Sequence, residues 1–209
     1  MRYIVTAPWW LRLGFPNGLT WNIPTQEKIL YLTFDDGPHP EQTTFVLDEL
    51  KRYNAKATFF CIGKNIKEHP DVYKRILLEG HRTGNHTHNH LNKKNTSDEQ
   101  WLSDVKEAAQ WIDSNLFRPP YGRINGFCAN LLLQANPSYK IVMWNVLSAD
   151  FDTSKTGEHC FNYIKKHTRQ GSIILFHDSE KAAPRLRYSL PQTLEFFTNQ
   201  GFQFQAIKL

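Results

Sequence analysis

The chain has 209 residues, enough for one domain with a sizeable core, and 40% of its residues are hydrophobic and 13% aromatic. This composition excludes a disordered chain, and 11 Gly and 11 Pro without a period exclude collagen-like and low-complexity proteins. The net charge is +5, but no basic run exceeds two residues, so we expect no nucleic-acid partner.

The N-terminal part, residues 1–27, is rich in Trp and Pro and predicts an irregular strap over the main domain, residues 28–209. Prolines and an arginine interrupt any apolar stretch that would serve as an export signal, so the sequence by itself indicates a cytoplasmic protein. No apolar run approaches the ~20 residues of a membrane span. The three cysteines (Cys61, Cys128 and Cys160) are too widely spaced for a structural zinc site, while one disulfide stays open.

From residue 28 onward, short apolar runs alternate with segments of helical periodicity. The predicted strands cover residues 29–34, 57–62, 81–85, 116–118, 140–146, 172–176 and 202–207. The predicted helices cover residues 43–53, 66–79 with a break at Pro70, 97–115, 126–134, 156–167 and about 190–199. This alternation is typical of βαβ units and a parallel sheet. We predict one α/β domain with about seven strands.

Seven βα units are expected in fewer than 190 residues. A complete eightfold barrel typically takes ~250 residues, so this chain is too short for one. A distorted or incomplete (β/α)7 barrel therefore fits best, and a doubly wound open sheet is the alternative. In both folds the carboxyl ends of the strands share one rim, where active sites are built. Polar residues follow five of the predicted strands, which indicates a site at this rim.

His86 and His90 follow the third predicted strand and are four residues apart. On a helical turn they would face the same way, which is a spacing of metal ligands, and His88 would point elsewhere. With one carboxylate from another strand end they would form a two-histidine, one-carboxylate set. Such a set suits zinc, cobalt, manganese or ferrous iron.

Asp35 and Asp36 follow the first strand in a tight turn with Gly37 and Pro38. Neighbouring carboxylates repel each other unless a cation or a base neutralises them. We therefore expect one of the two to bind the metal while the other is free to act as a base.

Arg118 to Tyr121 follow the fourth strand, and His177 ends the run Ile173 to Phe176. Arg118 can pair with a carboxylate and hold it ionised. Two prolines stiffen this loop, so that the backbone N–H of Tyr121 can point at a developing oxyanion. An unperturbed histidine at position 177 would have a pKa near ~6.5, which suits a general acid.

Together these motifs resemble the polysaccharide deacetylase family, also described as the NodB-homology group and as carbohydrate esterase family four. The resemblance covers residues 28–207 and rests on four motifs in order: Thr33-Phe34-Asp35-Asp36-Gly37-Pro38, His86-Thr87-His88-Asn89-His90, Arg118-Pro119-Pro120-Tyr121 and Leu175-Phe176-His177. It implies a distorted (β/α)7 barrel, one divalent metal ion and removal of N-acetyl or O-acetyl groups from sugars. Zinc is the metal expected from the family, with cobalt, manganese or nickel as alternatives.

The resemblance also implies roles for single residues. Asp36, His86 and His90 look like the metal ligands, Asp35 like the general base and Arg118 like the residue that orients Asp35. The Tyr121 backbone looks like the oxyanion donor, His177 like the general acid and Asp150 like its partner. The residues implied in substrate contact are Pro120, Tyr121, Leu175 and Phe151.

One motif departs from the family pattern. The family usually carries Asp-x-x-Asp-Trp after the fifth strand, whereas this chain has Leu147, Asp150 and Phe151 at the three defined positions. Since Asp150 is kept, we expect proton transfer by His177 to be kept as well. Leu147 and Phe151 would alter the shape of the acetyl pocket.

The expected activity is metal-dependent removal of N-acetyl groups from N-acetylglucosamine units of chitin oligomers or peptidoglycan. The alternatives are an O-acetyl deacetylase acting on a polymer such as xylan, a non-catalytic sugar-binding descendant, and a ferrous-iron oxygenase with the same ligands. The oxygenase would leave Asp35 and His177 without a role. We expect a monomer whose partner is an acetylated carbohydrate, and the resemblance points to the cell envelope.

Overall fold

The central strand β1 (Ile29–Asp35) is buried along its whole length in the computed structural model, which describes residues 6, 10 and 13–209. An apolar run without alternation is what a parallel strand covered on both faces requires. β1 pairs with β2 (Ala57–Cys61) on one side and with β7 (Ile173–His177) on the other, both in parallel. The first strand of the rim motifs therefore lies at the centre of the sheet.

The parallel sheet has the strand order β5-β4-β3-β2-β1-β7-β6, and β8 (Gln203–Phe204) pairs with the start of β1. The remaining strands are short: β3 (Arg82–Asn85), β4 (Leu116–Phe117), β5 (Lys140–Ile141) and β6 (Val146–Leu147). In the described part of the chain, no ladder joins β5 to β6, so the sheet curls without closing. This curled sheet confirms the predicted incomplete barrel.

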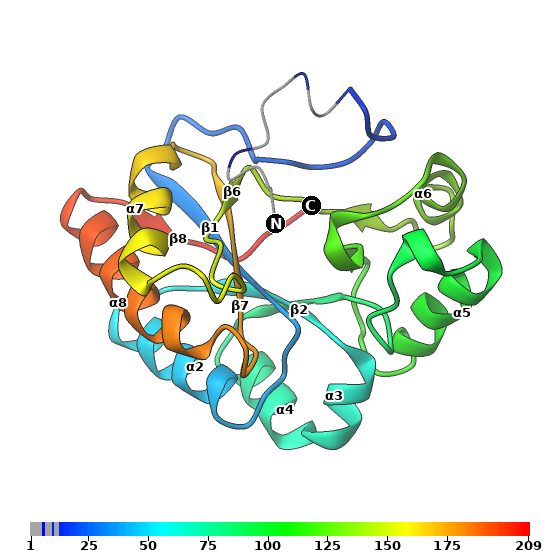
Figure 1. The fold of residues 1–209 in the computed structure, drawn as a ribbon, viewed down its shortest axis with the longest axis horizontal. Helices are drawn as coiled ribbons and strands as arrows, with labels where there is room; N and C mark the ends of the chain where they lie inside the picture. The colour runs from blue at the N-terminus through cyan, green and yellow to red at the C-terminus, as the bar shows by residue number, and fades with distance from the viewer. Residues whose placement is uncertain (1–5, 7–9, 11–12) are drawn as a thin grey trace.

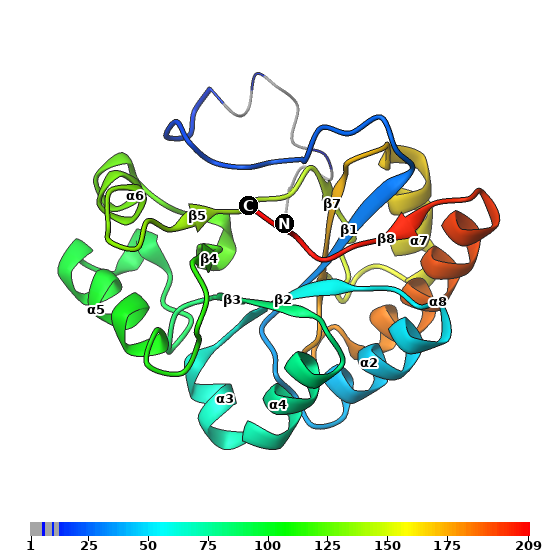
Figure 2. The same ribbon diagram turned by 180° about the vertical axis from the view of Figure 1, so that it is seen from behind.

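Helices surround the outside of the curled sheet, as Figures 1 and 2 show from opposite sides. They are α2 (Gln42–Arg52), α3 (Gly63–Glu68), α4 (Pro70–Leu78), α5 (Asp98–Ala108), α6 (Gly126–Leu133), α7 (Gly157–His167) and α8 (Ala183–Asn199). Two short 3-10 turns, η1 (Lys93–Asn95) and η2 (Pro120–Gly122), lie in the loops beyond β3 and β4. The break predicted at Pro70 separates α3 from α4.

The prediction of one strand over residues 140–146 is wrong, because β5 and β6 are separated by residues 142–145. The buried guanidinium of Arg118 explains the break. Its Nε donates to the carbonyl of Val142 at 3.0 Å and its Nη2 to that of Met143 at 2.9 Å. These carbonyls are therefore bound by a side chain instead of by a neighbouring strand.

Two helix boundaries also differ from the predictions. α8 begins at Ala183 rather than near residue 190, and it continues through Pro191. Its buried residues Leu186, Leu190 and Leu194 recur at helical spacing on both sides of the proline, and their burial holds the helix together. α5 ends at Ala108 rather than near residue 115, because the chain turns there to enter β4.

The strap crosses the open side of the sheet where it is described. Thr20 bridges Val142 in parallel, and Asn22 bridges Ser172 in antiparallel orientation. Residues 1–5, 7–9 and 11–12 of the predicted strap lie outside the described residues. All three cysteines are buried and free. Among the described residues, no helix has the length and apolar character needed to cross a membrane.

Candidate metal and active site

Asp35 and His177 face each other across the parallel pairing of β1 and β7, at the carboxyl ends of both strands. Thr33 and Leu175 are paired two residues earlier in the same register. Since residues two apart in a strand share a face, all four side chains lie on one face of the sheet. This pairing brings two predicted catalytic residues, Asp35 and His177, to the same rim.

The three predicted metal ligands come together although they lie on two loops. One ligand atom from each of Asp36, His86 and His90 lies within 4.8 Å of the others. The Oδ1 atom of Asp36 lies 3.4 Å from Nε2 of His90 and 3.9 Å from Nε2 of His86. A carboxylate and two imidazoles at this spacing are a donor set for a divalent ion with open positions for water.

The protonation of His86 fits metal binding. Burial, followed by the neighbouring His90, lowers the pKa of His86 to about 3, so its ring is neutral at pH 7. Its Nδ1 lies 2.7 Å from the carbonyl oxygen of Arg118. Because a carbonyl only accepts hydrogen bonds, Nδ1 must carry the proton, and the lone pair of Nε2 is left to face Asp36. A metal-binding histidine is typically oriented by such a bond.

The loop that carries these histidines is not the helical turn that the sequence predicted. Thr87 and His90 have left-handed backbone angles, with φ of 64° and 56°. The N–H of His90 donates to Oγ1 of Thr87, and the N–H of Thr87 donates to Oδ1 of Asn85. Side-chain bonds to the backbone therefore shape a loop that brings the rings of His86 and His90 to a centroid distance of 5.0 Å.

Asp104 on α5 holds this loop from behind, and sequence analysis missed it. Its Oδ2 accepts the backbone N–H of His88 at 3.1 Å and that of Asn89 at 3.0 Å, and its Oδ1 accepts the amide of Asn89. Asp104 is buried. A sequence signal was absent, because Asp104 lies on a helix well away from the histidines in the chain. His88 points away from the cluster, as predicted, and pairs with Glu107 at 3.2 Å.

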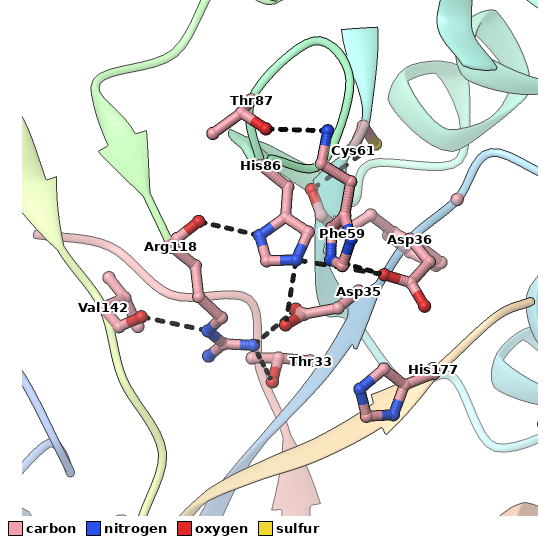
Figure 3. A network of polar contacts seen from close by, with 12 residues as sticks. Thr33, Asp35, Asp36, Phe59, Cys61, His86, Thr87, Arg118, Val142 and His177 are labelled. Atoms are coloured by element: carbon pink, nitrogen blue, oxygen red, sulfur yellow. Dashed lines mark hydrogen bonds and ion pairs between the residues drawn. The ribbon is translucent and has the colours of Figure 1, made fainter. Parts of the chain in front are cut away.

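Arg118 binds the second aspartate, Asp35. Its Nη1 donates to Oδ1 of Asp35 and to Oγ1 of Thr33, each at 2.8 Å. Figure 3 shows the Asp35 carboxylate between this guanidinium and the His86 ring, whose Nε2 lies 3.7 Å from Oδ2 of Asp35. The Arg118 side chain is fully buried and lies over the ring of Phe60 at 4.1 Å. Asp35 and Asp36 therefore share His86 as a neighbour, but only Asp35 is bound by Arg118 and only Asp36 pairs with His90.

Tyr121 lies in η2 with φ 59° and ψ 11°, a left-handed conformation that is uncommon for a tyrosine. Its ring packs on His90 with centroids 4.6 Å apart and is 58% exposed. The next residue, Gly122, also has a positive φ, and a Cβ there would lie 2.6 Å from Trp144. Packing of this kind fixes the turn and with it the direction of the Tyr121 backbone.

His177 and Asp150 form the pair that the sequence predicted. The ring Nδ1 of His177 lies 2.7 Å from Oδ1 of Asp150, and the backbone N–H of His177 donates to Oδ2 at 2.8 Å. Burial alone would lower the pKa of His177, but the charge and hydrogen bond of Asp150 outweigh it and raise this pKa to about 9. His177 is therefore protonated at neutral pH and able to donate a proton.

The residues expected to contact substrate differ in their neighbours and in their exposure. Phe151 packs edge-on against the His177 ring at 5.4 Å, where the family pattern has tryptophan. Leu175 is buried and pairs in register with Leu147, the residue that replaces the first aspartate of the family motif. Pro120 is also buried. Of the residues implied in substrate contact, Tyr121 is the one with a large exposed surface.

Asp178 is a second residue to which sequence analysis assigned no role. Its carboxylate accepts the backbone N–H of Gly37 at 3.0 Å and the hydroxyl of Thr43, and burial raises its pKa to about 7. A Cβ at Gly37 would lie 2.2 Å from Oδ2 of Asp178, so glycine is required at this approach. Asp178 thus anchors the turn that carries Asp35 and Asp36. In the sequence, its position directly after His177 was the only indication that it lies near the site.

Comparison with known proteins finds one family model and relatives that are named as carbohydrate deacetylases. Residues 22–138, more than half of the chain, match the family model described as polysaccharide deacetylase. A peptidoglycan-N-acetylglucosamine deacetylase of Bacillus cereus is 37% identical over 199 residues, 92% of each chain. A chitooligosaccharide deacetylase of Azorhizobium caulinodans is 34% identical over 163 residues, 75% of this chain and 76% of the relative.

Solved structures agree in fold. A peptidoglycan N-acetylglucosamine deacetylase crystallised with an N-oxidanyl-benzamide has a TM-score of 0.84 and 26% identity, covering 96% of this chain and 94% of that one. The peptidoglycan deacetylase PdaC of Bacillus subtilis has a TM-score of 0.77 and 27% identity, covering 88% and 90%.

Proposed function

The chain belongs to the polysaccharide deacetylase family, whose members remove acetyl groups from carbohydrates, and we propose that it hydrolyses the N-acetyl group of N-acetylglucosamine units in peptidoglycan or chitin oligosaccharides. The relatives named above support this substrate class. The geometry of the rim supports a mechanism that uses one divalent metal ion.

Asp36, His86 and His90 would hold the ion, with zinc as the metal favoured by family resemblance. When bound, a divalent ion polarises the acetyl carbonyl and lowers the pKa of a water molecule from 15.7 towards ~7. The neutral His86 ring, fixed by the Arg118 carbonyl, suits this task. Asp36 supplies the negative charge of the set.

Asp35 takes a proton from the attacking water as the water oxygen bonds to the carbonyl carbon. Arg118 binds Asp35 and keeps its carboxylate turned towards the site. The backbone N–H of Tyr121 donates to the oxyanion that develops on the carbonyl oxygen. His177 then gives its proton to the sugar nitrogen as the C–N bond breaks, which leaves acetate and a free amine.

The observation that carries the proposal is the division of labour between two adjacent aspartates. Asp35 pairs with Arg118 at 2.8 Å, whereas Asp36 lies 3.4 Å from His90. In hydrolysis assisted by a divalent ion, one carboxylate would help to hold the ion and another would accept a proton from the attacking water. Asp36 beside His90 and Asp35 beside Arg118 are placed for these two tasks.

The test is acetate release from N-acetylglucosamine oligomers, peptidoglycan glycan strands and acetylated xylan. Protein stripped with a chelator is compared with the same protein resupplied with zinc or cobalt, and Asp36→Asn serves as the ligand control. We expect acetate from the N-acetylated substrates only when metal is restored. Acetate from stripped protein would contradict metal dependence, and acetate from xylan alone would contradict the N-acetyl substrate.

A further inference from the structure

A groove of about 350 Å³ lies beside the candidate active site and has no role in the mechanism above. Its walls include Phe15 from the strap, Lys93 and Lys94 from the segment after the histidine loop, and Arg123 with Asn125 from the segment after Tyr121. The side chains lining it include three cations and no carboxylate.

Two of these three cations have no counter-charge. Nζ of Lys93 lies 2.6 Å from Oδ1 of Asp98 and also donates to the carbonyl of Thr96, so its charge is compensated. Lys94 and Arg123 are exposed, and within the described ranges neither makes an ion pair with a carboxylate. The groove therefore has an uncompensated charge of two.

The groove is attached to the candidate active site through both of its walls. Consecutive Cα atoms are about 3.8 Å apart, so Arg123 starts within ~8 Å of Tyr121, and Lys94 within ~15 Å of His90. The rings of Tyr121 and His90 are themselves in contact, with centroids 4.6 Å apart. A glycan bound with one sugar at the rim has its next sugars within reach of this groove.

The backbone of both walls is fixed before any ligand binds. The N–H of Arg123 donates to the carbonyl of Pro120 at 3.1 Å, and Gly122 packs against Trp144. On the other wall, the N–H of Lys94 donates to Oδ1 of Asn92 at 3.0 Å. The backbone that carries the two cations is therefore in place when an anion binds, and only their side chains have to be ordered.

We propose that Lys94 and Arg123 form an anion subsite that binds a carboxylate on the sugar next to the one that loses its acetyl group. The guanidinium of arginine matches the two oxygens of a carboxylate, and lysine adds a point charge. A neutral chitin oligomer has no group for this subsite. A glycan in which N-acetylglucosamine alternates with a sugar bearing a free carboxylate, as in peptidoglycan strands whose stem peptides have been removed, presents one. The inference rests on the proposed function and narrows its substrate.

The test compares three glycans of equal length with the full chain: a neutral N-acetylglucosamine oligomer, a strand alternating N-acetylglucosamine with N-acetylmuramic acid, and the same strand with its carboxylates converted to amides. The amidated strand differs from the free-acid strand only at the carboxyl groups, which no longer carry a charge. The variants are Lys94→Gln/Arg123→Gln and the control Lys74→Gln/Lys166→Gln, which removes two exposed cations on α4 and α7. Neither helix contributes a residue to the groove, and Figure 1 shows both apart from α6, which follows one of its walls.

We expect wild-type kcat/KM to be about three- to tenfold higher for the free acid than for the amide, and this ratio to shrink with added salt. Lys94→Gln/Arg123→Gln should bring the ratio close to one, while the control keeps it. A wild-type ratio of one, or a ratio unchanged in Lys94→Gln/Arg123→Gln, would overturn the anion subsite alone. Absence of acetate from all three glycans with metal bound would instead overturn the proposed function, and the inference with it.

Discussion

The Nη1 atom of Arg118 lies 2.8 Å from Oδ1 of Asp35, and both side chains are almost completely buried. The same guanidinium binds the carbonyls of Val142 and Met143 in the gap between β5 and β6. One side chain therefore orients the candidate base and also binds the chain segment that joins β5 to β6. Catalysis and stability are coupled at this residue.

Replacement of Asp35 by Asn should separate chemistry from metal binding. Asn keeps the size of the side chain but does not accept a proton from water, so kcat should fall by about 10²- to 10⁴-fold. The metal content, measured by atomic spectroscopy, should stay near that of the wild type because Asp36, His86 and His90 are intact. Turnover close to the wild type would contradict the role of Asp35 as the base.

Replacement of Arg118 by Met should destabilise the fold. It leaves Asp35 as a buried charge without its partner, and breaking a buried ion pair in this way costs about 3–5 kcal/mol of unfolding free energy. Urea unfolding measures the loss. The matched control is Lys64→Met, which removes an exposed pairing with Glu68 and should cost less than about 1 kcal/mol. Equal losses in the two variants would refute the structural role of Arg118.

The pH at which kcat/KM falls on the alkaline side should depend on Asp150. His177 must be protonated to act as an acid, and its pKa is raised to about 9, so kcat/KM should fall as the pH rises through about 9. Asp150→Asn removes the charge that raises this pKa and leaves burial, which lowers it. The alkaline limb should therefore move to lower pH in the variant. An alkaline limb at the same pH in both proteins would exclude His177 as the titrating acid.

Asp104 should control metal affinity without touching the metal. Asp104→Ala removes the acceptor of the Asn89 N–H and one of the two acceptors of the His88 N–H, which keeps the Asp104 backbone carbonyl. Loss of such supporting bonds typically weakens metal binding by about 10- to 100-fold. Competition with a chromophoric chelator measures the affinity. Glu107→Gln is the control, since Glu107 pairs with the His88 side chain rather than with the loop backbone. Unchanged affinity in Asp104→Ala would show that the loop holds its shape by itself.

Metal removal should lower thermal stability. A ligand that binds only the folded state adds about 2.7 kcal/mol at a concentration 100 times its Kd. Zinc should therefore raise the Tm of chelator-treated protein, and Asp36→Asn should abolish the increase. An equal increase in wild type and Asp36→Asn would place the stabilising ion elsewhere.

The chain pattern alone predicts much of the fold and of the site. The buried apolar runs 29–34 and 57–62 match β1 and β2 closely, because local periodicity and burial agree there. The polar motifs could be assigned to one rim because parallel strands bring their carboxyl ends together. The positions of Asp35, Asp36, His86, His90, Arg118 and His177 at this rim follow from that single rule.

Long-range contacts decided the rest. Whether residues 140–146 form one strand or two depends on Arg118, a residue far away in the chain. The left-handed histidine loop depends on side-chain bonds and on Asp104 in α5. The charge of the groove depends on Asp98, which neutralises Lys93 and leaves Lys94 free. A sequence determines which groups are present and their local periodicity, whereas only the folded chain determines which partner each buried polar group obtains.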